Sequence, residues 1–113
     1  MSKLHAIDSE TLDSLKDLLG ENFNLLIETY IGDSSERMGR LKEAIKADDD
    51  DGVCAEAHGI KGSSRNIGAV VIGDLCEVLE TQARQQALVD KEEQFAALEQ
   101  AFADVCEALS AYL

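Results

Sequence analysis

Apolar residues recur three and four positions apart along most of this chain, which is the spacing of one face of an α-helix. This spacing predicts five helical segments joined by short connections. They cover residues 8–19, 22–47, 51–66, 69–86 and 90–112. The run from Val70 to Ile72 would suit a strand, but Leu75, Leu79 and Ala83 continue at helical spacing and no partner strand is evident. The pattern predicts an all-α fold: an antiparallel up-down four-helix bundle with a short additional N-terminal helix.

Residues at the ends of these segments support the predicted limits. Asp8 is suited to cap the first helix, and Gly20 is suited to end it. Asp90, with Glu93 three residues later, resembles a capping box at the start of the last helix. Within the second segment, residues 32–35 (GDSS) weaken the helix, so we expect a bend there.

Four consecutive aspartates, residues 48–51, precede Gly52 and raise the question of a calcium loop. In the EF-hand pattern glycine holds the sixth position, which would place Ala47 at the first ligand position and His58 at the twelfth. Neither residue can serve as the carboxylate ligand required there. We therefore interpret the aspartates as the start of the next helix, where negative charge is favourable.

The third segment separates into a buried face and an exposed face when its residues are placed about 100° apart around a helix. The buried face contains Val53, Ala57, Ile60, Ser64 and Ile67. The solvent-facing strip contains His58, Lys61, Gly62 and Arg65. Glycine inside a helix costs up to about 1 kcal/mol relative to alanine, so an open space beside the imidazole is a plausible reason for it. The strip suits a nucleophilic histidine that another molecule approaches and that then holds an anion.

Length and composition indicate one domain, residues 1–113. No apolar run is long enough for a membrane helix, and the N-terminus lacks the apolar core of a signal peptide, so we expect a cytoplasmic protein. The chain begins with Met and contains no linker, from which we expect a free-standing module.

The three cysteines, Cys54, Cys76 and Cys106, are odd in number and far apart in the sequence. This argues against disulfides or a zinc site and predicts that all three are core residues.

The formal net charge of −13 excludes whole classes of partner. Nucleic acids and anionic membranes both require clustered positive charge, so we expect neither as a partner. Lys61 and Arg65 form a local basic exception beside His58. The alternative interpretation is that both are ordinary solvated side chains.

The run from His58 to Ser64, HGIKGSS, followed by Ile67, Gly68 and Ala69, resembles the motif of histidine-containing phosphotransfer (HPt) domains. That motif is roughly H-x-L-K-G-S/A-S/A followed by a hydrophobic residue and glycine. The family's next helix resembles this chain at five further positions: Leu75, Cys76, Leu79, Glu80 and Arg84. The resemblance is close over residues 50–86 and elsewhere rests on length and helical pattern. Ile60 replaces the usual leucine, and Gly59 adds a second glycine beside the histidine.

The resemblance implies a phosphorelay intermediate with His58 as phosphoacceptor. A receiver-domain aspartate of a hybrid sensor histidine kinase would donate the phosphoryl group, and the aspartate of a response regulator would receive it. Lys61 and Arg65 would stabilise the phosphoryl group, Gly62 would provide a steric opening, and Ser63, Glu80 and Arg84 would border the site.

The sequence lacks both an ATP-binding glycine loop and paired carboxylates for magnesium, so we expect a phosphocarrier rather than an enzyme. We expect it to act as a monomer that binds no cofactor or metal of its own. Mg²⁺ would come with the partner receiver domain.

Three other interpretations stay open. The chain could be a helical-bundle adaptor that binds a signalling partner without phosphate transfer, or an enzyme in which His58 is a general base, although no nucleophile or metal site accompanies it. Glu80 and Arg84, four residues apart, could be an ordinary intrahelical ion pair. His5 is assigned no role.

Overall fold

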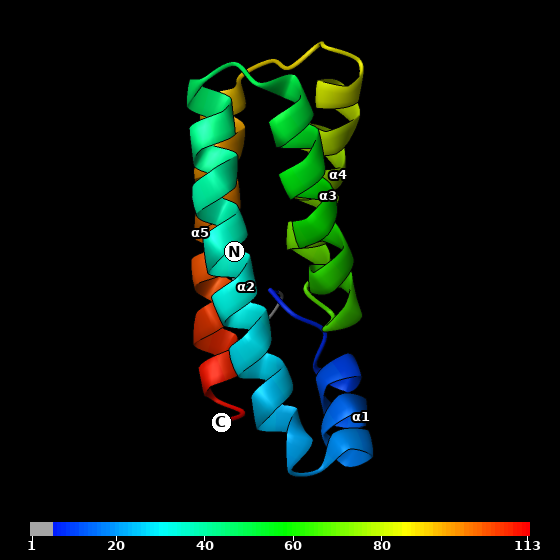
Figure 1. Ribbon diagram of the computed structural model, residues 1–113. Helices are drawn as coiled ribbons and strands as arrows, with labels where there is room; N and C mark the ends of the chain where they lie inside the picture. Colours follow the sequence, from blue (N-terminus) through cyan, green and yellow to red (C-terminus); the bar gives the residue numbers. More distant parts are fainter. Residues whose placement is uncertain (1–5) are drawn as a thin grey trace.

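The computed structural model describes residues 6–113, so the prediction for His5 lies outside the described residues. Five α-helices and no strands occur within that range (Figure 1). They are α1 (Ser9–Leu19), α2 (Asn22–Lys46), α3 (Asp50–Asn66), α4 (Val70–Arg84) and α5 (Lys91–Ser110). The predicted all-α fold is confirmed, including the helix rather than a strand at α4. No helix of the described part is both long and apolar enough to cross a membrane.

The four longer helices lie side by side in Figure 1 and enclose the core. Helix α3 packs against α2 and α4, α5 packs against α4 and α2, and α1 contacts α2. Helix α2 is continuous through residues 32–35, and Ser34 is buried there. The bend expected at this point stays a prediction. Between α2 and α3 the buried hydroxyls of Tyr30 and Ser64 are 2.7 Å apart, so Ser64 lies on the buried face of α3 as predicted.

Helix α1 has the predicted ends. The Asp8 side chain accepts a hydrogen bond from the Glu10 amide at 3.1 Å, and Gly20 ends the helix with a positive φ of 54°. The Asp8 amide also donates to the Gly68 carbonyl at 2.8 Å. This bond ties the start of α1 to the turn between α3 and α4.

The aspartate run begins α3, as the interpretation from sequence requires. The Asp49 side chain accepts a hydrogen bond from the Gly52 amide at 3.0 Å, and Asp50 and Asp51 occupy the first turn. The turn from α3 into α4 is tight, and Gly68 adopts a φ of 85° there. A Cβ at Gly68 would lie 3.0 Å from Thr11, so glycine also permits the close approach of α1.

Two predictions are wrong in detail. Asp90 makes no capping hydrogen bond at the start of α5, because its left-handed backbone (φ 48°) is not that of a capping residue. Near this end of the helix, the Gln94 side-chain amide donates a hydrogen bond to the Val89 carbonyl. Only Cys76 of the three cysteines is fully buried, and burial raises the pKa of its thiol to about 12. Cys54 and Cys106 are half-buried, and Cys54 packs against the edge of the core.

Candidate functional site

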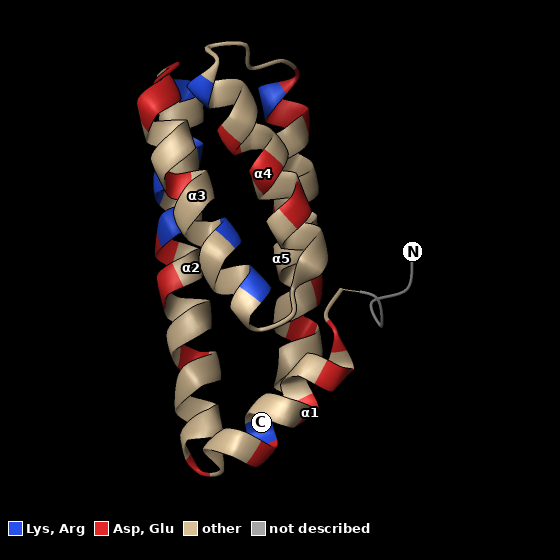
Figure 2. Ribbon diagram, turned by 90° about the vertical axis from the view of Figure 1, so that its right-hand side faces the viewer, with Lys and Arg blue, Asp and Glu red and all other residues tan. Residues whose placement is uncertain are grey.

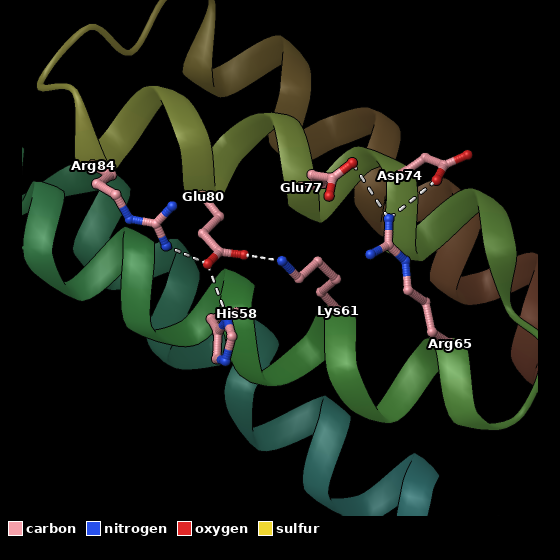
Figure 3. Close-up of polar contacts among 7 residues, drawn as sticks. All are labelled: His58, Lys61, Arg65, Asp74, Glu77, Glu80 and Arg84. Atoms are coloured by element: carbon pink, nitrogen blue, oxygen red, sulfur yellow. Dashed lines mark hydrogen bonds and ion pairs between the residues drawn. The ribbon is translucent and has the colours of Figure 1, made fainter.

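His58 stands on the outer face of α3 with 69% of its side chain exposed. Ala57 and Ile60 face the core, so His58, about 100° from Ala57 around the helix, points outward. A hydrogen-bond partner nevertheless restrains the ring. Its Nδ1 lies 2.9 Å from Oε2 of Glu80 on α4 (Figure 3).

Glu80 is the buried centre of this cluster, with 4% of its side chain exposed. Its Oε2 accepts from Arg84 at 2.6 Å as well as from His58, and its Oε1 pairs with the Lys61 ammonium at 2.6 Å. Burial raises the pKa of Glu80, but hydrogen bonds from Lys61, His58 and Arg84 outweigh burial and lower this pKa to about 2. The carboxylate therefore stays ionised at neutral pH.

The ionised carboxylate determines which tautomer of His58 is present. A carboxylate can only accept hydrogen bonds, so a neutral imidazole beside it must carry its proton on Nδ1. The lone pair is then on Nε2. Figure 3 shows Nε2 on the side of the ring that faces away from Glu80 and α4. The arrangement presents an exposed nucleophilic nitrogen in a fixed orientation.

The residues predicted to form one solvent-facing strip have different surroundings in the structure. The Lys61 side chain is only 19% exposed, because it turns into the α3–α4 interface to reach Glu80. Arg65 pairs at 3.4 Å with Asp74 and with Glu77 of α4, away from Glu80 (Figure 3). The two predicted phosphoryl ligands are thus engaged with carboxylates, and their contact with a phosphoryl group stays a prediction.

Gly62 and Ser63 follow His58 by four and five residues on the same helix. The Ser63 hydroxyl donates within α3, at 3.2 Å to the Gly59 carbonyl and at 3.3 Å to that of Ile60. A Cβ added at Gly62 would meet no atom within 4 Å, so the space one turn after His58 is open. That this opening serves an approaching partner stays a prediction, as does the role of Ser63.

Arg37 on α2 is a neighbour of the site that the sequence did not single out. Its guanidinium lies over Gly59, where an added Cβ would be 2.5 Å from Cζ. The signal in the sequence was Gly59 itself, a second glycine in the helix directly after the histidine. A glycine inside a helix permits close approach by another group, but its position alone cannot tell which residue approaches.

Charge is unevenly distributed on this acidic protein. Figure 2 shows Lys and Arg on the upper half of α2 and on α3, with Asp and Glu interspersed on both helices. Within the described residues, no group of three or more His, Cys, Asp or Glu is arranged to hold a metal ion. The cations near His58 are each paired with a carboxylate, Lys61 and Arg84 with Glu80 and Arg37 with Glu56.

Comparisons with known proteins show the family and the fold. The family model of the Hpt domain matches residues 25–110. The structure is similar to the crystal structure of histidine-containing phosphotransfer protein B (HptB) from Pseudomonas aeruginosa PAO1, with a TM-score of 0.91 and 31% sequence identity. That match covers 95% of this chain and 93% of HptB, whereas no curated protein sequence matches. The chain belongs to the Hpt domain family, the histidine phosphotransfer proteins of two-component phosphorelays.

Proposed function

We propose that this protein accepts a phosphoryl group on Nε2 of His58 from the aspartate of a receiver domain and passes it to the aspartate of a response regulator. The donor receiver domain belongs to a hybrid sensor histidine kinase. One observation carries the proposal: an exposed imidazole whose Nδ1 is held by the buried, ionised carboxylate of Glu80. This contact leaves Nε2 as the nucleophile.

The transfer step follows from this tautomer. The Nε2 lone pair attacks phosphorus, the N–P bond forms, and the P–O bond to the donor aspartate breaks, with its electron pair leaving on the carboxylate. The ring becomes cationic because Nδ1 keeps its proton. Glu80 compensates that charge through the 2.9 Å hydrogen bond. The reverse sequence delivers the phosphoryl group to the next aspartate.

Lys61 and Arg84 have two roles in this proposal. Both pair with Glu80 at 2.6 Å and hold its carboxylate in place. Their positive charges also favour a phosphoryl group on the neighbouring ring, because phosphoryl transfer relies on electrostatic stabilisation. Arg65 contributes at longer range, since Asp74 and Glu77 offset its charge.

The partners supply what the chain lacks. The receiver domains bring the Mg²⁺ and the reactive aspartate, while this chain acts as a cytoplasmic, monomeric phosphocarrier without kinase machinery of its own. Its scaffold is an antiparallel four-helix bundle of α2 to α5 with α1 as the additional N-terminal helix. The ring of helix contacts from α2 to α5 and back to α2 supports this layout.

A transfer assay tests the proposal. The protein is incubated with a receiver domain phosphorylated on its aspartate, and the product is analysed for acid-labile, base-stable phosphate. The proposal requires such phosphate on His58 together with its loss when a second, unphosphorylated receiver domain is added. An adaptor without phosphate chemistry would bind the receiver domain and remain unlabelled.

Substitutions at Gly62 test whether the open space beside His58 serves the transfer. Gly62→Ala should raise the free energy of unfolding by up to about 1 kcal/mol, because glycine is a poor helix former and the added methyl group meets no atom within 4 Å. Gly62→Gln should be stabilised similarly but accept phosphate poorly, because its side chain leans toward the N-terminus and over the ring. Thermal melts and transfer rates measure both effects.

Gly32 provides the matched control. It also lies inside a helix with no atom within 4 Å of an added Cβ, but it is on the N-terminal half of α2. Gly32→Gln should therefore gain stability without loss of transfer. If Gly62→Gln accepts phosphate as fast as Gly32→Gln, the opening at Gly62 has no role in the approach of the donor.

A further inference from the structure

Arg37 of α2 lies against α3 at Gly59, the residue that follows His58. Gly59 follows His58 by about 100° around α3, on the side facing α2, whereas Lys61 lies about 60° in the other direction, facing α4. The Arg37 guanidinium from α2 covers Gly59, with Cζ and Nη1 each 2.5 Å from the position of an added Cβ. Any side chain at residue 59 would displace it.

The cations next to Glu80 lie on the Nδ1 side of the His58 ring. On the Nδ1 edge, Lys61 and Arg84 both pair with Glu80 at 2.6 Å. Nε2 is on the opposite edge and faces away from α4 (Figure 3). A phosphoryl group bonded to Nε2 therefore extends away from Glu80, and Lys61 and Arg84 act on it through their charge without direct contact. Arg37 lies on the α2 side of α3, the side not occupied by that cluster.

Arg37 keeps donors for a further anion. It pairs with Glu56 through Nη1 at 3.1 Å, and 40% of its side chain is exposed. Glu56 does not depend on Arg37 alone, since its other oxygen pairs with Nε of Arg40 at 3.1 Å. A guanidinium has five N–H donors, so the Glu56 contact leaves most of them available for phosphoryl oxygens.

We propose that Arg37 binds the phosphoryl group on Nε2 of His58, with Gly59 providing the space in which its guanidinium lies. The proposal rests on the proposed function and adds to it a contact residue from α2. As the P–O bond of the donor breaks and the N–P bond forms, the three peripheral phosphoryl oxygens carry negative charge throughout. Arg37 donates hydrogen bonds to these oxygens and exchanges no proton with them.

Phosphoramidate is the donor that tests this contact without a partner surface. It transfers its phosphoryl group to the imidazole and releases ammonia, so no receiver domain has to dock. Arg37→Ala should reduce the rate of His58 phosphorylation about tenfold, less than the loss of a donor in a water-excluded site because Arg37 is partly exposed. Arg37→Lys should recover part of the rate. The lifetime of the phosphohistidine should shorten in Arg37→Ala.

Arg40→Ala is the matched control, because Arg40 pairs with the same glutamate at the same distance but lies nearly one turn further along α2. Its rate should stay within about twofold of the unsubstituted protein. Gly59→Ala provides a second, independent test, since its methyl group displaces the guanidinium without removing it. It should slow phosphorylation, and adding Arg37→Ala to it should cause little further loss.

The outcomes separate the two proposals. If the unsubstituted protein gains no phosphate on His58 from phosphoramidate or from a receiver domain, the proposed function fails and Arg37 has no phosphoryl group to bind. If that protein is phosphorylated and Arg37→Ala reacts as fast as Arg40→Ala, only the role of Arg37 is refuted. A defect with the receiver domain but not with phosphoramidate would also refute it, because Arg37 would then serve docking.

Discussion

Replacing His58 with glutamine is expected to abolish phosphate acceptance while the protein stays folded. The side chain is 69% exposed, so its loss opens no cavity in the core. The substitution removes only the hydrogen bond between Nδ1 and Glu80. A hydrogen bond of this kind contributes about 1 kcal/mol, and glutamine can replace part of it. Circular dichroism melts and the transfer assay should therefore show near-normal stability and no label.

His5→Gln is the control for this substitution, because His5 is the other histidine of the chain. It should accept phosphate like the unsubstituted protein. Retained label in His58→Gln would assign phosphorylation to another residue and refute the account of the site. Loss of label in both variants would show that the assay responds to something other than the acceptor.

The second large effect is expected at Glu80 and depends on pH. The folded protein lowers the pKa of this carboxyl from 4.5 to about 2, so folding favours the ionised form by on the order of 3 kcal/mol. This stabilisation is fully present above the unfolded pKa and is lost as the pH falls through 4.5 toward 2. About 2 kcal/mol of it should be lost by pH 3.

Glu80→Gln removes this titration. Urea unfolding at pH 6 and at pH 3 should show that the free energy of unfolding of the unsubstituted protein falls by about 2 kcal/mol more than that of the variant. At pH 6 the variant should be the less stable protein, because Lys61 loses its carboxylate partner in a largely buried setting. Glu28→Gln, a change at an exposed glutamate, should keep the full pH dependence. Equal pH dependence in Glu80→Gln would contradict the ionised buried carboxylate.

The helices could be predicted from the sequence because their determinants are local. Periodic apolar residues fix which face of α3 is buried, so the inward Ser64 and the outward His58 both follow from spacing alone. Asp8 and Gly20 act on atoms within their own turn, which is why the ends of α1 were also predictable. The capping box at Asp90 failed because the same residue pattern also fits the left-handed backbone found there.

Contacts between helices could not be predicted in the same way. Spacing placed Lys61 on the exposed strip, but a long side chain can turn toward a neighbouring helix, and the buried carboxylate of Glu80 attracts it. Arg37 is more than twenty residues from Gly59, and no periodic pattern relates the two. The resemblance in sequence identified Glu80 and Arg84 as bordering the site, but only the packing of α3 against α4 reveals a hydrogen bond that orients the ring.

The identity of the phosphorylated ring nitrogen distinguishes the proposed attack by Nε2 of His58 from attack by Nδ1. The protein, labelled with ¹⁵N in its histidines, is phosphorylated by a receiver domain, and ¹⁵N and ³¹P NMR spectra assign the N–P bond to one ring nitrogen. We expect a phosphoryl group on Nε2 of His58, with Nδ1 still protonated and directed at Glu80. Phosphorylation at Nδ1 would contradict the proposed mechanism, because there Nδ1 carries the proton that is donated to the Glu80 carboxylate.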